Sequence, residues 1–146
     1  MIDIFVPGVP VPKGSAKAFV VKGRAIVTQD NGAKQKPWAS SISYTAMQAM
    51  RFEKPVSGPV SISLTFYMPR PKGHYGSGKN SALVKDSAPQ NHVSKPDLDK
   101  LIRCVKDALT GVVWNDDSQV CRITETEKLY ETVSRGVGVK IRVTKI

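Results

Sequence analysis

The chain has 146 residues and a formal net charge of +10, with 40% hydrophobic and 23% charged residues. This length suits one domain with its own core, and this composition excludes a disordered chain. No apolar run approaches the roughly 20 residues of a membrane span, and the N-terminus lacks the basic start of a signal peptide. We therefore expect a cytoplasmic protein with reduced cysteines. The basic excess aids solubility, but it also favours a polyanionic partner, most commonly nucleic acid.

The first part of the chain is predicted to form a strand, a hairpin and a helix. Loose alternation over 2–6 indicates a strand, and a turn-rich proline segment follows over 7–14. Two short strands then predict a hairpin, with the strands over 18–21 and 25–28 and the turn at Lys22-Gly23-Arg24. Residues 37–51 lack glycine and have proline only at their first position, which predicts a helix.

The second part is predicted to add three strands and the clearest helix. Strict alternation predicts a half-buried strand over 60–66, and the polar, basic stretch 69–95 is predicted to be a flexible loop. Apolar residues at helical spacing, with a glycine just beyond them, predict a helix over 97–110. Two further strands are expected near 119–130 and 136–144. The whole chain, 1–146, is thus predicted to be one α+β domain, with a mixed β-sheet packed by two main helices.

Five of the eight aspartates lie between positions 97 and 117. Carboxylates repel one another, so this clustering indicates compensation by cations or by a bound metal. Four of these aspartates form two pairs, and each pair has an explanation that needs no metal. Asp97 and Asp99 suit the cap of a helix, and Asp116-Asp117 suits a turn. If a strand from Val112 passes back beside the start of the helix, the two pairs meet. Three converging carboxylates would suit Mg²⁺ and phosphodiester hydrolysis.

Three sequence blocks carry a family resemblance: Lys95-Pro96-Asp97-Leu98-Asp99-Lys100-Leu101-Ile102, Asp107-Ala108-Leu109-Thr110-Gly111 and Asn115-Asp116-Asp117-Ser118-Gln119-Val120. Together they resemble the RusA family of Holliday junction resolvases, which are Mg²⁺-dependent endonucleases of phages and prophages. A weaker similarity covers Phe5-Val6-Pro7-Gly8-Val9-Pro10-Val11-Pro12-Lys13-Gly14 and Arg24. The resemblance implies that Asp97, Asp99 and Asp117 hold the metal. Because neighbouring residues in an extended segment face opposite ways, Asp116 would be structural or would support the site without touching the metal.

The family places a lysine four residues after its second aspartate, where this chain has Arg103. Arginine contacts phosphate and stabilises charge in a transition state, but it is a poor proton donor. Lys100 and Lys106 lie nearby and could supply this positive charge instead. All three residues can also be explained as a basic helix face that contacts only solvent. Asp107 lies about 12 Å along the helix from Asp99 and is predicted to pair with Arg103 or Lys106.

Further basic residues are predicted to contact the DNA backbone, and the full set is Lys13, Lys17, Arg70, Lys72, Lys79, Lys95, Lys100 and Lys106. In the loop, Tyr75 is a candidate for stacking on an unpaired base, although a disordered surface loop explains this segment equally well. The stretch 73–80 is not a P-loop, because it ends in asparagine and no clear helix follows. His92 is a candidate phosphate contact, and Trp114 is expected in the core.

These features predict a Mg²⁺-dependent endodeoxyribonuclease that resolves Holliday junctions by paired symmetric nicks in DNA recombination and repair, with Mn²⁺ able to substitute. A two-fold homodimer on a four-way junction would deliver two matched nicks. The resemblance implies a phage- or prophage-encoded protein in the bacterial cytoplasm. One alternative is a non-catalytic phage module that binds nucleic acid, although a pure binder gains nothing from carboxylates beside phosphates. Another is a metal nuclease that cuts flaps or forks.

Overall fold

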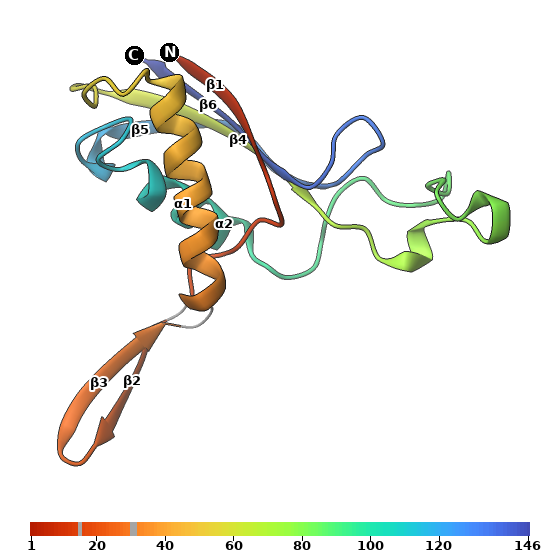
Figure 1. Cartoon of the computed structure of the whole chain (residues 1–146), viewed down its shortest axis with the longest axis horizontal. Helices are drawn as coiled ribbons and strands as arrows, with labels where there is room; N and C mark the ends of the chain where they lie inside the picture. Colours follow the sequence, from red (N-terminus) through yellow and green to blue (C-terminus); the bar gives the residue numbers. More distant parts are fainter. Residues whose placement is uncertain (15, 30–31) are drawn as a thin grey trace.

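The computed structural model describes residues 1–14, 16–29 and 32–146. Its centre is a four-stranded sheet in the order β1-β6-β4-β5, built from β1 (Ile2–Pro7), β4 (Val60–Met68), β5 (Val120–Tyr130) and β6 (Gly138–Lys145). β6 pairs antiparallel with β1 and with β4, whereas β5 pairs parallel with β4. The sheet is therefore mixed, as predicted, and β1 and β5 form its edges (Figure 1).

The alternating apolar residues of β4 lie at the centre of the core. Val60, Ile62, Leu64 and Phe66 are at most 1% exposed, as the period of two predicts. Two helices, α1 (Gly32–Ala49) and α2 (Leu98–Leu109), cover this core and pack against each other (Figure 1). The prediction of an α+β domain with two main helices is confirmed. Within the described residues, no helix combines the length and apolarity of a membrane span.

α1 begins five residues before its predicted start and ends two residues before its predicted end. The predicted start at Pro37 is wrong because a proline in the second turn removes only one early backbone hydrogen bond. After the proline, Trp38, Ile42 and Ala46 bury apolar surface, and their packing stabilises the helix on both sides of Pro37. At the other end, Arg51 and Phe52 have φ values of 54° and 56°, which turn the chain away from the helical path.

β2 (Ala16–Val21) and β3 (Arg24–Gln29) form a separate antiparallel hairpin that projects away from the main sheet (Figure 1). Its turn consists of Lys22 and Gly23, whose φ values are 49° and 75°, as expected for a two-residue hairpin turn. The predicted hairpin is confirmed, and Arg24 belongs to the second strand rather than to the turn.

The segment 69–95 extends away from α1 as a long loop (Figure 1). It contains two short 3-10 turns, η1 (Lys72–His74) and η2 (Gly78–Asn80). Its base is tied to the end of the sheet by Arg70, which donates to the carbonyl oxygens of Glu131 and Pro89, each at 2.8 Å. The flexibility of this loop stays a prediction.

The two cysteines differ in burial and should differ in reactivity. Both are free; Cys104 on α2 is 1% exposed and Cys121 on β5 is exposed. Burial, and then the charge of Asp107, raises the pKa of Cys104 to about 11, so its reactive thiolate is scarce near neutral pH. We expect a thiol titration with Ellman's reagent to modify only Cys121 in the native protein and both cysteines in guanidinium. In Cys121→Ser, rapid modification before unfolding would contradict the burial of Cys104.

Candidate functional site

Asp97 and Asp99 lie at the N-terminal end of α2. Asp97 occupies the N-cap position, with φ −70° and ψ 142°, yet its side chain makes no capping hydrogen bond. Its Oδ2 lies 3.9 Å from Lys100 Nζ, and Asp99 is exposed in the first helical turn. The alternative role of Asp97 as a side-chain cap is therefore wrong. Both carboxylates are open to solvent and to a ligand.

The chain that leads into α2 is bound to β5 through Lys128. Lys128 Nζ donates to the carbonyl oxygens of Ser94 and Pro96, each at 2.6 Å, and the Lys128 carbonyl accepts from the His92 N–H at 3.1 Å. The His92 ring packs edge-on against Tyr130, with 4.9 Å between the ring centroids. Burial, and then the charge of Lys128, lowers the pKa of His92. This shift favours the neutral ring, so His92 offers a phosphate less positive charge than an ordinary histidine does.

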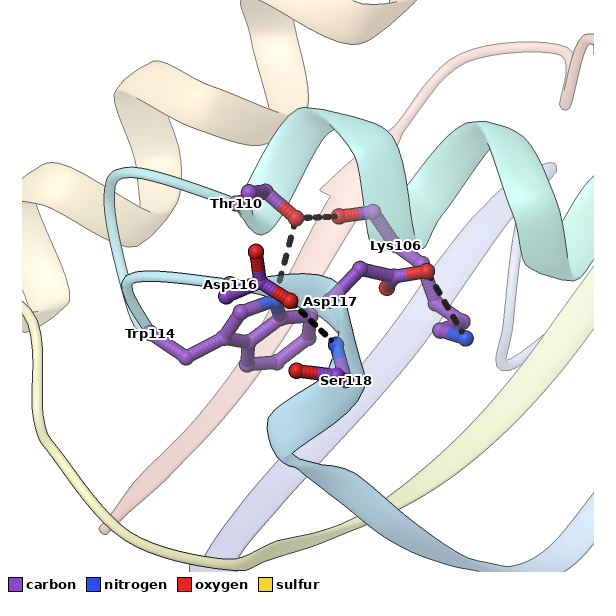
Figure 2. A network of polar contacts seen from close by, with 6 residues as sticks. All are labelled: Lys106, Thr110, Trp114, Asp116, Asp117 and Ser118. Atoms are coloured by element: carbon purple, nitrogen blue, oxygen red, sulfur yellow. Dashed lines mark hydrogen bonds and ion pairs between the residues drawn. The ribbon is translucent and has the colours of Figure 1, made fainter.

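Asp116 and Asp117 are adjacent but contact different partners (Figure 2). Asp116 caps the 3-10 turn η3 (Asp117–Gln119), and its Oδ1 accepts from the Ser118 N–H at 2.8 Å. Hydrogen bonding to Ser118, first by its side chain and then by its backbone N–H, lowers the pKa of Asp116. Asp117 Oδ2 instead pairs with Lys106 Nζ on α2 at 3.1 Å, whereas Asp117 Oδ1 is buried without a hydrogen-bond partner among the residues that the structure describes. Asp116 thus supports the turn, and Asp117 has one oxygen in an ion pair and one buried oxygen without a partner among the described residues.

Gln119 holds this turn in place. Its amide oxygen accepts from the backbone N–H groups of Asn115 and Asp116, at 2.8 and 2.9 Å. Its amide nitrogen donates to the carbonyl oxygens of Val56 and Gly58, at 3.0 and 2.9 Å. One side chain therefore ties the turn that carries Asp117 to the chain that enters β4.

Trp114 anchors the connection between α2 and η3. It is 0% exposed, and its indole N–H donates to Thr110 Oγ1 at 3.0 Å, while that hydroxyl donates to the Lys106 carbonyl at 2.9 Å (Figure 2). The prediction that Trp114 lies in the core is confirmed. The prediction of a returning strand from Val112 is wrong, because Gly111 adopts a φ of 84° and its N–H donates to the Trp114 carbonyl at 2.7 Å, which closes a turn instead.

This turn delivers Asp117 to the side of α2 that carries Asp99. Asp99, Arg103 and Lys106 share that side, since they are spaced four and three residues apart. Lys106 lies about 10 Å along the helix axis from Asp99, and Asp117 pairs with Lys106 rather than arriving on the predicted strand. In the described ranges, no group of three or more His, Cys, Asp or Glu side chains converges closely enough to hold a metal ion.

The donor chemistry of these residues nevertheless fits a hard divalent cation. Mg²⁺ prefers carboxylate oxygens and keeps several waters, and the orphaned Oδ1 of Asp117 is such a donor in a fixed position. Asp97 and Asp99 are exposed, so their side chains change rotamer easily. Like charges also repel when no cation lies between them. We therefore expect the three carboxylates to be further apart without a metal than with one.

An open cleft of about 520 Å³ adjoins the start of α2, where the proline-rich segment 9–14 faces the helix. Asp97 lines this cleft, together with four lysines: Lys13, Lys34, Lys95 and Lys100. The Lys13 N–H donates to the Lys100 carbonyl at 3.0 Å, which fastens the proline-rich segment to α2. The cleft therefore combines a strongly basic lining with access to one of the candidate metal ligands.

Lys13 also pairs with Asp107, with 3.0 Å between Nζ and Oδ2. The prediction that Asp107 pairs with Arg103 or Lys106 is therefore wrong. Lys106 is drawn to Asp117 instead, and the proline-rich segment brings Lys13 across α2 from a distant part of the sequence.

The other basic residues predicted to contact DNA lie further away. Lys72 and Lys79 are exposed on the extended loop (Figure 1). The Arg70 guanidinium already donates to the carbonyl oxygens of Glu131 and Pro89. It also lies 5.2 Å from the centroid of the Tyr130 ring. The side chain of Lys17 lies outside the described residues. In the same loop, the Tyr75 hydroxyl donates to Glu131 Oε1 at 3.4 Å. Contacts of these residues with DNA stay predictions.

Three residues that shape the site were missed by the sequence reasoning. Lys34 precedes the predicted helix start at position 37, so no helical pattern pointed to it. Gln119 stands three residues after Asp116, a spacing typical of a capping box, and this signal would have found it. Lys128 has no local signal, because its partners lie 32 and 34 residues away in the sequence.

Comparison with known proteins gives two findings. The sequence family described as endodeoxyribonuclease RusA matches residues 7–143, a span that includes every aspartate of the candidate site. The chain is also 34% identical over 144 residues to a Bacillus subtilis (strain 168) protein named "Uncharacterized protein YqaN", and the match covers 97% of this chain and 95% of that one.

The hydrogen bonds of Gln119 predict a loss of stability when they are removed. In Gln119→Leu, two backbone N–H groups and two carbonyl groups lose their partner at similar side-chain volume. We expect the free energy of unfolding to fall by about 1–3 kcal/mol, measured by urea denaturation. The matched control is Gln48→Leu, since Gln48 is exposed on α1, and it should change stability by less than about 0.5 kcal/mol. Equal effects of the two variants would contradict the role given to Gln119.

Proposed function

Because the chain belongs to the RusA family of endodeoxyribonucleases, we propose that it resolves four-way DNA junctions by paired symmetric nicks in a Mg²⁺-dependent reaction. The observation that carries this proposal is the placement of Asp117 on the Asp99 side of α2, with one buried carboxylate oxygen that has no partner among the described residues. Carboxylates repel DNA phosphates, so a protein that only binds DNA has no use for them here. A protein that cuts DNA with a bound cation does.

Asp97, Asp99 and Asp117 would hold the Mg²⁺ ion, and Mn²⁺ would substitute for it. When bound at such carboxylates, the ion supplies activation of water and stabilisation of the charge that develops on the phosphate. Asp116 would take no direct part, because its carboxylate is committed to the cap of η3. The chain's own contribution is to keep Asp117 fixed, through Gln119 and Trp114, while the two aspartates at the start of α2 stay free to adjust.

Lys100 and Lys106 compensate Asp97 and Asp117 as long as no metal is bound. These ion pairs are partly exposed, and such pairs contribute only about 0–1 kcal/mol each. Asp97 and Asp117 would therefore give up these pairs at little cost in order to hold the metal. The ammonium groups of Lys100 and Lys106 would then be free to contact phosphate oxygens. Arg103 lies on the same side of α2 between Asp99 and Lys106, where its guanidinium would contact phosphate oxygens and stabilise their charge.

The basic cleft supplies a path for the DNA strand. Lys13, Lys34, Lys95 and Lys100 would contact successive phosphates and lead the backbone to Asp97. Two such sites, related by the two-fold axis of a homodimer, would cut two strands of like polarity. This arrangement explains why one chain carries both a large basic excess and a small acidic group.

The first test compares two neighbouring aspartates. Asp117→Asn should reduce Mg²⁺-dependent cleavage of a synthetic four-way junction by more than about 100-fold, beyond the 10–100-fold effect typical of residues behind a metal ligand. Asp116→Asn is the matched control, since asparagine caps a helical turn as well as aspartate does, and it should cut within a few-fold of the unsubstituted protein. Strand-resolved gels of the junction, of a fork and of a flap should show paired symmetric nicks in the junction alone.

Each rival function has its own outcome in this assay. Salt-sensitive junction binding without cleavage in Mg²⁺ or Mn²⁺ would identify a non-catalytic binding module. Cleavage confined to forks or flaps would identify a nuclease for other branched DNA. Full cleavage by Asp99→Asn, which we expect to bind the junction without cutting it, would reject the metal site itself.

A second test addresses the path of the strand. Lys34 lines the basic cleft, whereas Lys36, two residues further along α1, lines the groove between α1 and α2. Lys34→Ala should weaken junction binding several-fold at low salt and reduce the salt dependence by about one counterion, while Lys36→Ala should leave both unchanged. Binding isotherms at several salt concentrations measure this, and equal losses in the two variants would show that only net charge matters.

A further inference from the structure

Lys128 differs from the other lysines around α2 because its ammonium group binds backbone rather than a carboxylate. Nζ donates to the carbonyl oxygens of Ser94 and Pro96 at 2.6 Å, and such short hydrogen bonds from a charged donor are strong. Lys13, Lys100 and Lys106 each pair with an aspartate instead. The Lys128 side chain thus holds the course of the chain, and its ammonium group is already engaged.

The position of Lys128 is set by the central sheet. It lies opposite Phe66 in the parallel pairing of β5 with β4, and Phe66 is 0% exposed. Its own carbonyl accepts the His92 N–H, and the adjacent Leu129 bridges to Asn91. The segment from 91 to 96 is therefore fastened to the most buried part of the fold immediately before Asp97.

The Asp97 carboxylate depends on this fastening. It makes no capping hydrogen bond to α2, and its ion pair with Lys100 is long, at 3.9 Å. The side chain is free to change rotamer, so the region its carboxylate reaches is set by the preceding peptide, whose carbonyl belongs to Pro96 and accepts from Lys128. If that hydrogen bond is lost, the peptide is free to rotate and the carboxylate moves with it.

We propose that Lys128 is a positioning residue, which keeps the Asp97 carboxylate within reach of the metal by holding the Ser94 and Pro96 carbonyls. This inference rests on the proposed function, because it assumes that Asp97 is a metal ligand. Lys128 touches neither metal nor DNA in this role. Residues that orient metal ligands typically change metal affinity by 10–100-fold when they are substituted.

The test measures metal binding by the full-length protein without DNA. Free Mn²⁺ is followed by electron paramagnetic resonance during a titration, and folding is checked by circular dichroism. Lys128→Met removes the donors at similar length and should weaken Mn²⁺ binding by about tenfold or more. Lys128→Arg keeps a charged donor and should recover most of the affinity. Lys145→Met, at the exposed end of β6, is the matched control and should bind Mn²⁺ like the unsubstituted protein.

The possible results separate this inference from the proposed function. If the unsubstituted protein binds no Mn²⁺ and cuts no junction, the proposed function fails. If it binds Mn²⁺ and folded Lys128→Met binds equally well, the role of Lys128 is overturned. Junction binding in EDTA should be the same in both proteins, and a loss there without a loss of Mn²⁺ affinity would make Lys128 a phosphate contact instead. If Lys128→Met does not fold, Lys128→Gln, which keeps one uncharged donor group, is judged by the same criteria.

Discussion

The arrangement around α2 depends on the repulsion between carboxylates and on the lysines that offset it. Asp97, Asp107 and Asp117 are each paired with a lysine, and these lysines belong to α2 itself and to the proline-rich segment. The Lys13–Asp107 pair draws the proline-rich segment across the helix and so forms one wall of the basic cleft. The Lys106–Asp117 pair lies where η3 meets α2. Charge compensation therefore accompanies both the cleft and the acidic side of the helix.

These pairs are suited to being replaced by a ligand. Their carboxylates are between 44% and 60% exposed, and exposed pairs add little stability. The turn that carries Asp117 does not rely on them, because Gln119 and the buried Trp114 hold it through hydrogen bonds and packing. A cation that takes the place of Lys106 would therefore leave the backbone unchanged. The site thus combines a rigid turn, held by Gln119 and Trp114, with exposed ion pairs that contribute little to stability.

Much of the fold was predictable because its elements have strong local patterns. β4 alternates strictly, α2 has a continuous apolar stripe, and the hairpin has a turn of lysine and glycine at its tip. The start of α1 was not predictable, since the packing of Trp38, Ile42 and Ala46 outweighs the local signal of Pro37. The aspartates of the candidate site were chosen from their clustering and from the family resemblance. Their spatial arrangement followed from Gly111, whose positive φ closes a turn where a strand was predicted.

Long-range polar contacts explain what remained hidden in the sequence. Lys128 acts on residues more than thirty positions away, and Lys13 reaches Asp107 across an even longer separation. A lysine has the same appearance in the sequence whether it binds a carbonyl, a carboxylate or a phosphate. The net charge of +10 therefore combines lysines with different roles: Lys128 holds backbone, Lys13, Lys100 and Lys106 offset aspartates, and Lys34 and Lys95 line the cleft without an aspartate partner among the described residues. The charge presented at the cleft is therefore set by which lysines have a carboxylate beside them, and this depends on long-range packing rather than on the local sequence.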